Sequence, residues 1–220
     1  MTNSDITATE TLSERCQGRL KVNEIFYSLQ GEGKFTGTAA VFVRLSGCNM
    51  HCTFCDTQHQ QGSEMTEQQI IDAITPYPAR HIVITGGEPA MQLTATLTTL
   101  LHKHGWFIQM ETNGSLPLAD GCAVDWITCS PKDLPLRIQR IDELKVLFDT
   151  RLQDNAVRIS QLADVKAQEY RLQPVDASME LTGHELHEQN IKNLEATINY
   201  ILQNPKWKLS LQTHKIINVR

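Results

Sequence analysis

Three cysteines, Cys48, Cys52 and Cys55, lie within one stretch of eight residues. They follow a short apolar run over residues 39–45, which is rich in β-branched and aromatic side chains and is closed by a Ser-Gly pair. Such a run is typical of a buried β-strand. We therefore predict that the three sulfur atoms lie on a loop at the end of a strand, where they can surround one inorganic centre.

The spacing C-x3-C-x2-C limits the kind of centre that these thiols can hold. A structural zinc site usually takes four protein ligands, and an ordinary iron–sulfur cluster also takes four cysteines. A four-iron cluster bound by only these three thiolates would leave one iron open for a substrate or cofactor. The alternatives are a zinc site completed by a distant His or Cys and a chance group of core cysteines. A disulfide framework is disfavoured, because the chain has 220 residues and starts without a secretory signal.

The overall composition is that of an ordinary globular protein, and it argues against several classes of function. A net charge of −5 argues against a nucleic-acid-binding surface. No stretch approaches the ~20 apolar residues of a membrane span, so no membrane partner is expected. The first residues lack the basic start and apolar core of a signal peptide, so we expect a cytoplasmic protein with reduced thiols. Cys16, Cys122 and Cys129 are expected to be buried or incidental.

Apolar runs alternate with helical patterns along the chain. Strands are predicted over residues 22–28, 39–45, 80–85, 106–110, 124–129, 143–148 and 170–174. Helices are predicted over residues 67–79, 93–101, 151–163 and 191–201, and a final extended segment over 207–214. The alternation predicts an α/β fold with a parallel sheet covered by helices. Six units from residue 39 onward are too few for a closed eightfold barrel, so we expect a partial, open (β/α)6 barrel. It is expected to form a single domain over residues 21–220, after a flexible tail over residues 1–20.

Polar motifs follow three of the predicted strands at the point where each strand ends. The motifs are Gly86-Gly-Glu-Pro89, Glu111-Thr-Asn-Gly114 and Ser130-Pro-Lys132. The carboxyl ends of parallel strands meet at one edge of a sheet, and α/β proteins bind their ligands at that edge. We therefore expect these motifs to face the cysteine loop across one site.

Two further features indicate a polar ligand. The loop Leu29–Gly33 has two glycines that permit close approach of the backbone, with Gln30 and Glu32 as polar groups. It is not a phosphate loop, because no Gly-Lys-Ser/Thr follows it. Arg44 stands in an otherwise apolar strand and needs an anionic partner. It either forms a structural ion pair or binds a substrate carboxylate with its planar guanidinium.

Taken together, these motifs resemble those of the radical S-adenosylmethionine (SAM) superfamily. The cysteine spacing, the aromatic Phe54 before the last cysteine, and the Gly-Gly-Glu-Pro motif carry this resemblance. A more specific set of stretches is similar to the 7-carboxy-7-deazaguanine synthase family of the queuosine and 7-deazapurine pathway. These stretches are residues 27–33, 42–48, 55–57, 84–89, 111–114, 130–132, 172–174 and 209–215.

The resemblance implies a role for each matching residue. Cys48, Cys52 and Cys55 are expected to hold a [4Fe-4S] cluster, and the hydroxyl of Thr57 to bind Mg²⁺. Glu88 is expected to receive the ammonium group of SAM. The expected SAM contacts are Phe54, Cys55, Asp56, Gly87, Glu88, Glu111, Asn113, Ser130, Pro131 and Lys132. The expected contacts of the pterin substrate are Leu29, Gln30, Gly31, Arg44 and Thr85. Gln173, His214 and Lys215 also fit family motifs, without an assigned role.

The same resemblance implies a lyase that converts 6-carboxy-5,6,7,8-tetrahydropterin to 7-carboxy-7-deazaguanine with release of ammonia. A SAM-derived radical carries this chemistry, so no side chain is assigned as a catalytic residue. A homodimer and an electron donor such as flavodoxin or ferredoxin are expected, with no direct contact to nucleic acid. Two other functions remain as alternatives: a radical SAM activase of a glycyl-radical enzyme, and a zinc-stabilised binding module.

Overall fold

The computed structural model describes residues 18–53, 55, 57, 60–152 and 154–220. The described residues form one nine-stranded sheet in the order β3-β1-β2-β4-β5-β6-β7-β8-β9. The strands are β1 (Arg19–Leu29), β2 (Ala39–Leu45), β3 (Ser63–Thr66), β4 (His81–Gly86), β5 (Phe107–Thr112), β6 (Trp126–Cys129), β7 (Glu143–Phe148), β8 (Glu169–Pro174) and β9 (Lys208–Leu209). The helices are α2 (Glu67–Ile74), α3 (Ala95–Lys103), α4 (Asn155–Gln161), α5 (Gly183–Gln203) and α6 (Thr213–Ile216), with short 3₁₀ helices η1 (Gly33–Phe35), η2 (Pro89–Met91) and η3 (Ala177–Met179).

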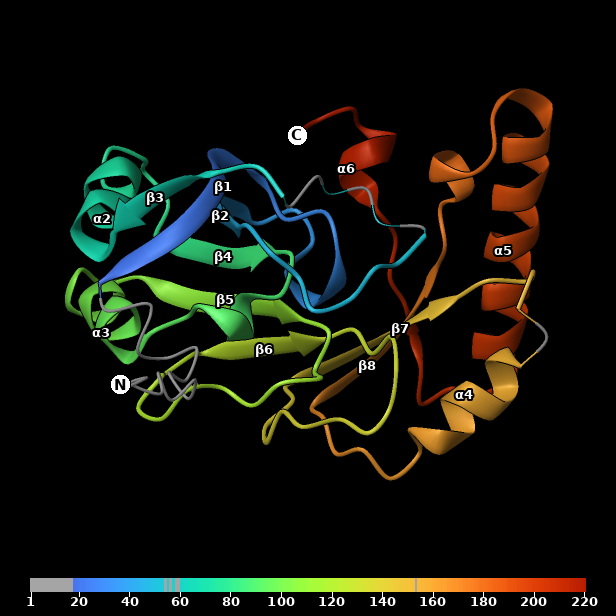
Figure 1. Ribbon diagram of the computed structural model, residues 1–220. Coiled ribbons are helices and arrows are strands. Elements are labelled where there is room, and N and C mark those ends of the chain that lie inside the picture. Colours follow the sequence, from blue (N-terminus) through green and yellow to red (C-terminus); the bar gives the residue numbers. More distant parts are fainter. Residues whose placement is uncertain (1–17, 54, 56, 58–59, 153) are drawn as a thin grey trace, which may run out of the picture.

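The sheet is parallel from β2 through β9, whereas β1 pairs antiparallel with both β2 and β3. The six predicted parallel strands are therefore confirmed, and the sheet is open, because β3 and β9 lie at opposite ends of the strand order. In Figure 1, α2 and α3 lie near β1 to β5, whereas α4 and α5 lie at the other end of the sheet beside β7 and β8. The segments 113–125 and 130–142 contain no helix, so the barrel is less regular than a full (β/α) repeat.

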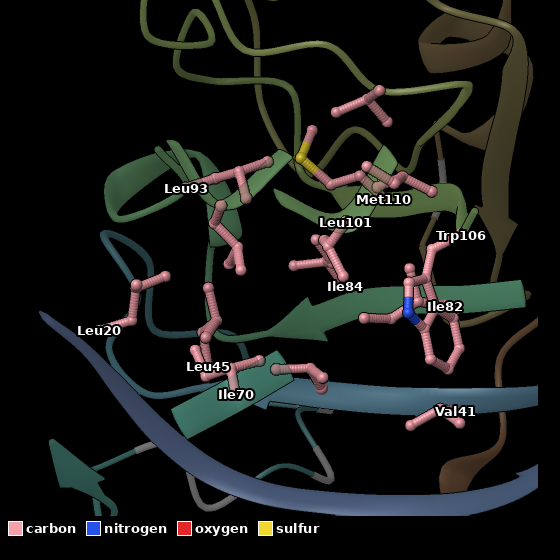
Figure 2. Close-up of a cluster of buried hydrophobic side chains, with 14 of the residues drawn as sticks. Leu20, Val41, Leu45, Ile70, Ile82, Ile84, Leu93, Leu101, Trp106 and Met110 are labelled. Carbon is pink, nitrogen blue, oxygen red and sulfur yellow. The ribbon is translucent and has the colours of Figure 1, made fainter. Parts of the chain in front are cut away.

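The strands have two distinct faces, and this division creates the site. One face is apolar and packs under α2 and α3, as Figure 2 shows for Leu45, Ile82, Ile84 and Met110. Side chains alternate between the two faces of a strand. The intervening residues therefore point to the opposite face of the sheet. Those that line a cavity there include Phe42, Arg44, Val83, Thr85, Glu111, Lys145 and Gln173.

The helix α2 shows why the local sequence forms the element that it does. Thr66 and Gln69 form a capping box at its first turn. Ile70, Ile71 and Ile74 lie on one face and are fully buried. The helix ends at Ile74, close to the predicted end near Pro76 and Pro78, because these prolines cannot continue it.

The observed elements differ from the expected ones in three places. The strand β1 begins at Arg19, before the predicted start of this strand at residue 22, and Leu20 is fully buried. The short strand β3 pairs with β1 and was not predicted. The expected extended segment over 207–214 is extended only at its start and becomes helix α6 at Thr213. Residues 1–17, which cover most of the expected flexible tail and Cys16, lie outside the described residues. No helix in the described part of the chain has the length and apolar character needed to cross a membrane.

Candidate functional site

The carboxyl ends of the parallel strands border a cavity of about 320 Å³. The predicted site residues that line it are Leu29, Gln30, Gly31, Arg44, Cys48, Cys52, Cys55, Thr57, Thr85, Gly87, Glu111, Asn113, Ser130 and Lys132. The structure therefore brings together motifs that are spread over more than a hundred residues of sequence. Phe54 and Asp56 lie outside the described residues. Glu88 and Pro131 are buried and do not line the cavity.

The three cysteines lie on the loop after β2, are half-buried, and carry free thiols. The amide of Met50 donates to Cys48 Sγ at 3.4 Å, and the amide of Cys55 donates to the carbonyl of Cys52 at 3.2 Å. Burial raises the pKa of Cys48 and of Cys52 above the usual value for a thiol. Binding of iron to this loop would therefore release protons from both thiols.

The arrangement of these thiols bears on the kind of metal group that they fit. Among the described residues, no group of three or more His, Cys, Asp or Glu side chains is placed to hold a single metal ion. In an iron–sulfur cubane each thiolate binds its own iron atom, so the ligands need not converge on one point. Three free thiols on one loop at the wall of a cavity therefore fit a cluster better than they fit a mononuclear zinc site.

Gly87 allows the Gly-Gly-Glu-Pro segment to pack directly on the cysteine loop. Its amide donates to the carbonyl of Leu45 at 3.0 Å, and the amide of Glu88 donates to the carbonyl of Gly47 at 2.9 Å. A Cβ atom at Gly87 would lie 1.8 Å from the carbonyl oxygen of Gly47. Only glycine fits this position, and the two loops are thereby joined just where the cavity begins.

Glu88 has a different position from the one expected. Its carboxylate is fully buried and accepts hydrogen bonds from Thr112 Oγ1 at 2.7 Å, the amide of Asn113 at 2.7 Å and the amide of Ala90 at 3.0 Å. Burial raises the pKa of Glu88, although these three donors and Lys132 act in the opposite direction. The carboxylate is thus used to tie the end of β4 to the end of β5, and it does not face the cavity as a receptor for an ammonium group.

Lys145 is a central residue of the cavity that sequence reasoning missed. Its side chain projects from β7, and its Nζ lies 2.5 Å from Glu32 Oε2 and 3.0 Å from Glu111 Oε2. The second oxygen of each carboxylate also has a donor: Gln212 Nε2 lies 2.9 Å from Glu32 Oε1, and Gln109 Nε2 lies 2.9 Å from Glu111 Oε1. The sequence did indicate a buried cation here, because Lys145 interrupts an apolar strand in the same way as Arg44.

Glu32, Lys145 and Glu111 form a buried triad in which the pKa values of the two carboxyl groups shift in opposite directions. Burial alone would raise the pKa of Glu32, but the adjacent ammonium of Lys145 outweighs it and lowers that pKa to about 2. Burial raises the pKa of Glu111. Lys145 acts in the opposite direction, but the negative charges of Glu32 and Glu143 raise this pKa further, so the net shift is upward. After the end of β6, which neighbours β7, burial and the charge of Lys145 lower the pKa of Lys132 to about 8.

Arg44 forms the structural ion pair that was one of its two expected roles, and it reaches the cavity as well. Its Nε lies 2.8 Å from Glu24 Oε1. Its Nη1 donates to Thr57 Oγ1 at 3.1 Å, so the predicted magnesium ligand and the predicted carboxylate ligand are in contact. Phe26 and Phe42 stack at 4.8 Å beside them and supply an apolar wall.

The carboxyl-terminal segment closes one side of the cavity. The amide and the hydroxyl of Thr213 both donate to the carbonyl of Gly31 at 2.9 Å. The ring of His214 packs on Gly31 so closely that a Cβ there would lie 2.1 Å from Nδ1. Gln173 and His214 line the cavity, whereas Lys215 Nζ forms an ion pair with Asp176 at 2.7 Å. The other lining residues that sequence reasoning did not single out are Phe26, Phe42, Met50, Val83, Leu147, Gln212 and Arg220.

The chain is similar to known proteins over most of its length. The model of the radical SAM superfamily matches residues 42–153. A 7-carboxy-7-deazaguanine synthase from Bacteroides thetaiotaomicron is 44% identical over 201 residues, which cover 91% of this chain and 98% of that protein. The enzyme of the same name from Burkholderia multivorans is 37% identical, over 90% and 98% of the two chains. The crystal structure of QueE from Escherichia coli superposes with a TM-score of 0.70 at 28% identity, covering 93% of this chain and 98% of that one. The chain therefore belongs to the 7-carboxy-7-deazaguanine synthase family of the radical SAM superfamily.

Proposed function

We propose that this protein converts 6-carboxy-5,6,7,8-tetrahydropterin to 7-carboxy-7-deazaguanine with release of ammonia, as a radical SAM lyase of queuosine biosynthesis. The observation that carries the proposal is that the three cysteine thiols and the guanidinium of Arg44 line one cavity. A site for cofactor cleavage and a site for an anionic substrate would then be adjacent. The similarity of the chain to its relatives over nearly their whole length supports the same activity.

Cys48, Cys52 and Cys55 would hold a [4Fe-4S] cluster, which when bound supplies the electron that cleaves SAM. The residues that would hold SAM itself lie at the ends of β4, β5 and β6. They are Gly87, Glu111, Asn113, Ser130 and Lys132, with Phe54 and Asp56 from the cysteine loop. Glu88 and Pro131 act from behind this surface, since Glu88 fixes the amide of Asn113.

The substrate would occupy the other side of the cavity. Arg44 would bind its carboxylate through a charge-assisted, fork-like pair of hydrogen bonds. Leu29 would contact the pterin ring from the end of β1, Gln30 and Gly31 from the loop after it, and Thr85 from β4. Phe26 and Phe42 would pack against a flat ring. The 2-amino group and ring N–H of a pterin are donors, and Glu32 provides a buried, ionised acceptor for them.

Three further components belong to this proposal. Thr57 Oγ1 would bind Mg²⁺ beside the substrate carboxylate, because Mg²⁺ prefers hard oxygen ligands and keeps part of its shell for substrate or water. A one-electron donor such as flavodoxin or ferredoxin would reduce the cluster. The protein would act in the cytoplasm as a homodimer, as the family resemblance implies.

The test is a turnover assay on protein that has been reconstituted with iron and sulfide under anaerobic conditions. With SAM, a reductant, Mg²⁺ and the carboxytetrahydropterin, we expect a product with the mass of 7-carboxy-7-deazaguanine and an equivalent of ammonia. Cleavage of SAM only after a glycyl-radical protein is added, with the pterin left unchanged, would support an activase instead. Colourless protein that retains zinc would support a binding module.

A further inference from the structure

The antiparallel pair β1–β2 contains an irregularity next to Arg44. Val22 pairs with Leu45, but the next pair along the ladder is Glu24 with Arg44, so two steps on β1 correspond to one step on β2. Asn23 is therefore the extra residue of a β-bulge. A bulge of one residue exchanges the faces on which the following side chains lie.

The consequence of the bulge can be followed along β1. Before it, Leu20 and Val22 point into the apolar core. After it, Ile25 packs against that core, whereas Phe26 lines the cavity. Without the extra residue, Glu24 and Phe26 would share the face of Leu20 and Val22. The bulge thus turns Glu24 toward the cavity side of the sheet and sets it directly opposite Arg44.

Glu24 binds two guanidinium groups at the same time. Its Oε1 accepts from Arg44 Nε at 2.8 Å, and its Oε2 pairs with Nη2 of Arg220. The guanidinium of Arg220 lies 4.9 Å from the centre of the Phe26 ring. The main-chain oxygen of Arg220 accepts a hydrogen bond from Ser28 Oγ at 2.5 Å. Both arginines line the cavity, whereas Glu24 does not. The carboxylate therefore holds two cations at the cavity wall from behind.

We propose that Glu24 is a positioning residue for the carboxylate of the substrate: it fixes the orientation of Arg44 and retains Arg220 beside it. This inference rests on the proposed function, in which Arg44 binds that carboxylate. A guanidinium has two hydrogen-bonding edges, and Glu24 occupies the edge that carries Nε. The terminal nitrogens are thereby directed toward Thr57 and the cavity. A long side chain that is held in its binding orientation loses less conformational entropy when the ligand binds.

The experiment uses the reconstituted enzyme with Glu24→Gln. This substitution keeps the shape of the side chain and removes the charge that holds both arginines. We expect KM for the carboxytetrahydropterin to rise about tenfold, since hydrogen bonds to charged groups contribute this much or more, while kcat changes little. The matched control is Glu64→Gln, which removes an exposed partner of Arg19 at 3.8 Å on the same sheet and should leave KM and kcat unchanged.

A second measurement separates positioning from a general loss of order. Tetrahydropterin without the carboxylate serves as a competitive inhibitor, and we expect its inhibition constant to be the same in Glu24→Gln and in the wild type. In an Arg44→Met background, Glu24→Gln should add no further increase in KM, because the two residues act as one unit. An unchanged KM in Glu24→Gln, or equal weakening of both pterins, would overturn the inference. Absence of product from the wild-type protein would instead refute the proposed function.

Discussion

The ammonium of Lys145 and the carboxylate of Glu32 lie 2.5 Å apart in the cavity, although 113 residues separate them in the sequence. Lys145 belongs to β7, and Glu32 belongs to the loop that follows β1. Glu111, at the end of β5, completes the group at 3.0 Å from the same ammonium. One buried cation thus connects three separate parts of the sheet, and it leaves two carboxylates for a single positive charge.

Removal of this cation tests how strongly the triad stabilises the fold. In Lys145→Met, the two buried carboxylates would lose their partner, and a buried charge without a partner is strongly unfavourable. We expect the free energy of unfolding to fall by about 3–5 kcal/mol, measured by urea titration of purified protein. The control is Lys208→Met, whose partner Glu169 lies 2.7 Å away in an exposed pair, and it should cost less than about 1 kcal/mol. Equal stability of Lys145→Met and wild type would contradict this view of the triad.

Cys52 provides the direct test of the cluster ligands. We expect Cys52→Ala to lose the iron–sulfide absorbance, most of the bound iron and all turnover together, because two thiolates hold a cubane poorly. Cys122→Ala should keep all three properties, since Cys122 is half-buried behind α3, where its thiol contacts the carbonyl of Leu93 at 3.4 Å. Iron content and product formation after identical reconstitution are the measurements. Full activity of Cys52→Ala would remove this residue from the ligand set.

Thr57 can be separated from the cluster by its response to magnesium. In Thr57→Ala the cluster absorbance should be unchanged. The Mg²⁺ concentration that gives half-maximal turnover should rise by roughly tenfold or more, because a direct ligand is lost. Thr53→Ala, an exposed residue on the same loop, serves as the control. The hypothesis fails when the magnesium titrations of Thr57→Ala and wild type coincide.

The pair Asp176–Lys215 predicts a pH dependence of stability at acid pH. Burial would raise the pKa of Asp176, but Lys215 at 2.7 Å, Asn190 and the amide of Ser178 outweigh it and lower that pKa to about 2. A carboxyl with a lowered pKa stabilises the fold at every pH above its ordinary value, and that stabilisation is lost as the pH falls toward 2. Solvent screening weakens this partly exposed ion pair, so we expect the lowered pKa of Asp176 to contribute on the order of 1 kcal/mol to the free energy of unfolding.

The measurement is the free energy of unfolding of the wild type and of Asp176→Asn between pH 2 and pH 6. The difference between the two proteins should be largest near pH 6 and should shrink as the pH approaches 2. A constant difference over this range would show that Asp176 titrates as it does in the unfolded chain.

The parallel strands and the residues at their ends could be predicted from sequence, because both signals are local. An apolar run that ends in Gly-Gly-Glu-Pro or Ser-Pro-Lys marks a strand and its polar end within a few residues. For the same reason, most of the expected ligand residues, among them Cys48, Arg44 and Lys132, do line the cavity.

Features that depend on contacts between distant segments could not be predicted in this way. The bulge at Asn23 is set by the pairing of β1 with β2, and the orientation of Glu24 follows from it. Helix α6 forms where Thr213 meets the carbonyl of Gly31, in a sequence that otherwise favours an extended chain. The inward orientation of Glu88 depends on Thr112, the last residue of β5, and on the amide of Asn113, which follows it.

Gly87 connects the packing of two loops to the loading of the cluster. Alanine at this position would place its Cβ 1.8 Å from the carbonyl of Gly47, so the cysteine loop or the Gly-Gly-Glu-Pro loop must move. We expect Gly87→Ala to bind less than half the iron of the wild type after identical reconstitution, measured by iron assay and absorbance. Gly37→Ala is the matched control: its φ of +85° costs about 1–2 kcal/mol for a side chain, but the space around it is open. Because both variants lose stability and only Gly87→Ala displaces the cysteine loop, equal iron contents would show that the close contact with Gly47 does not control the cluster site.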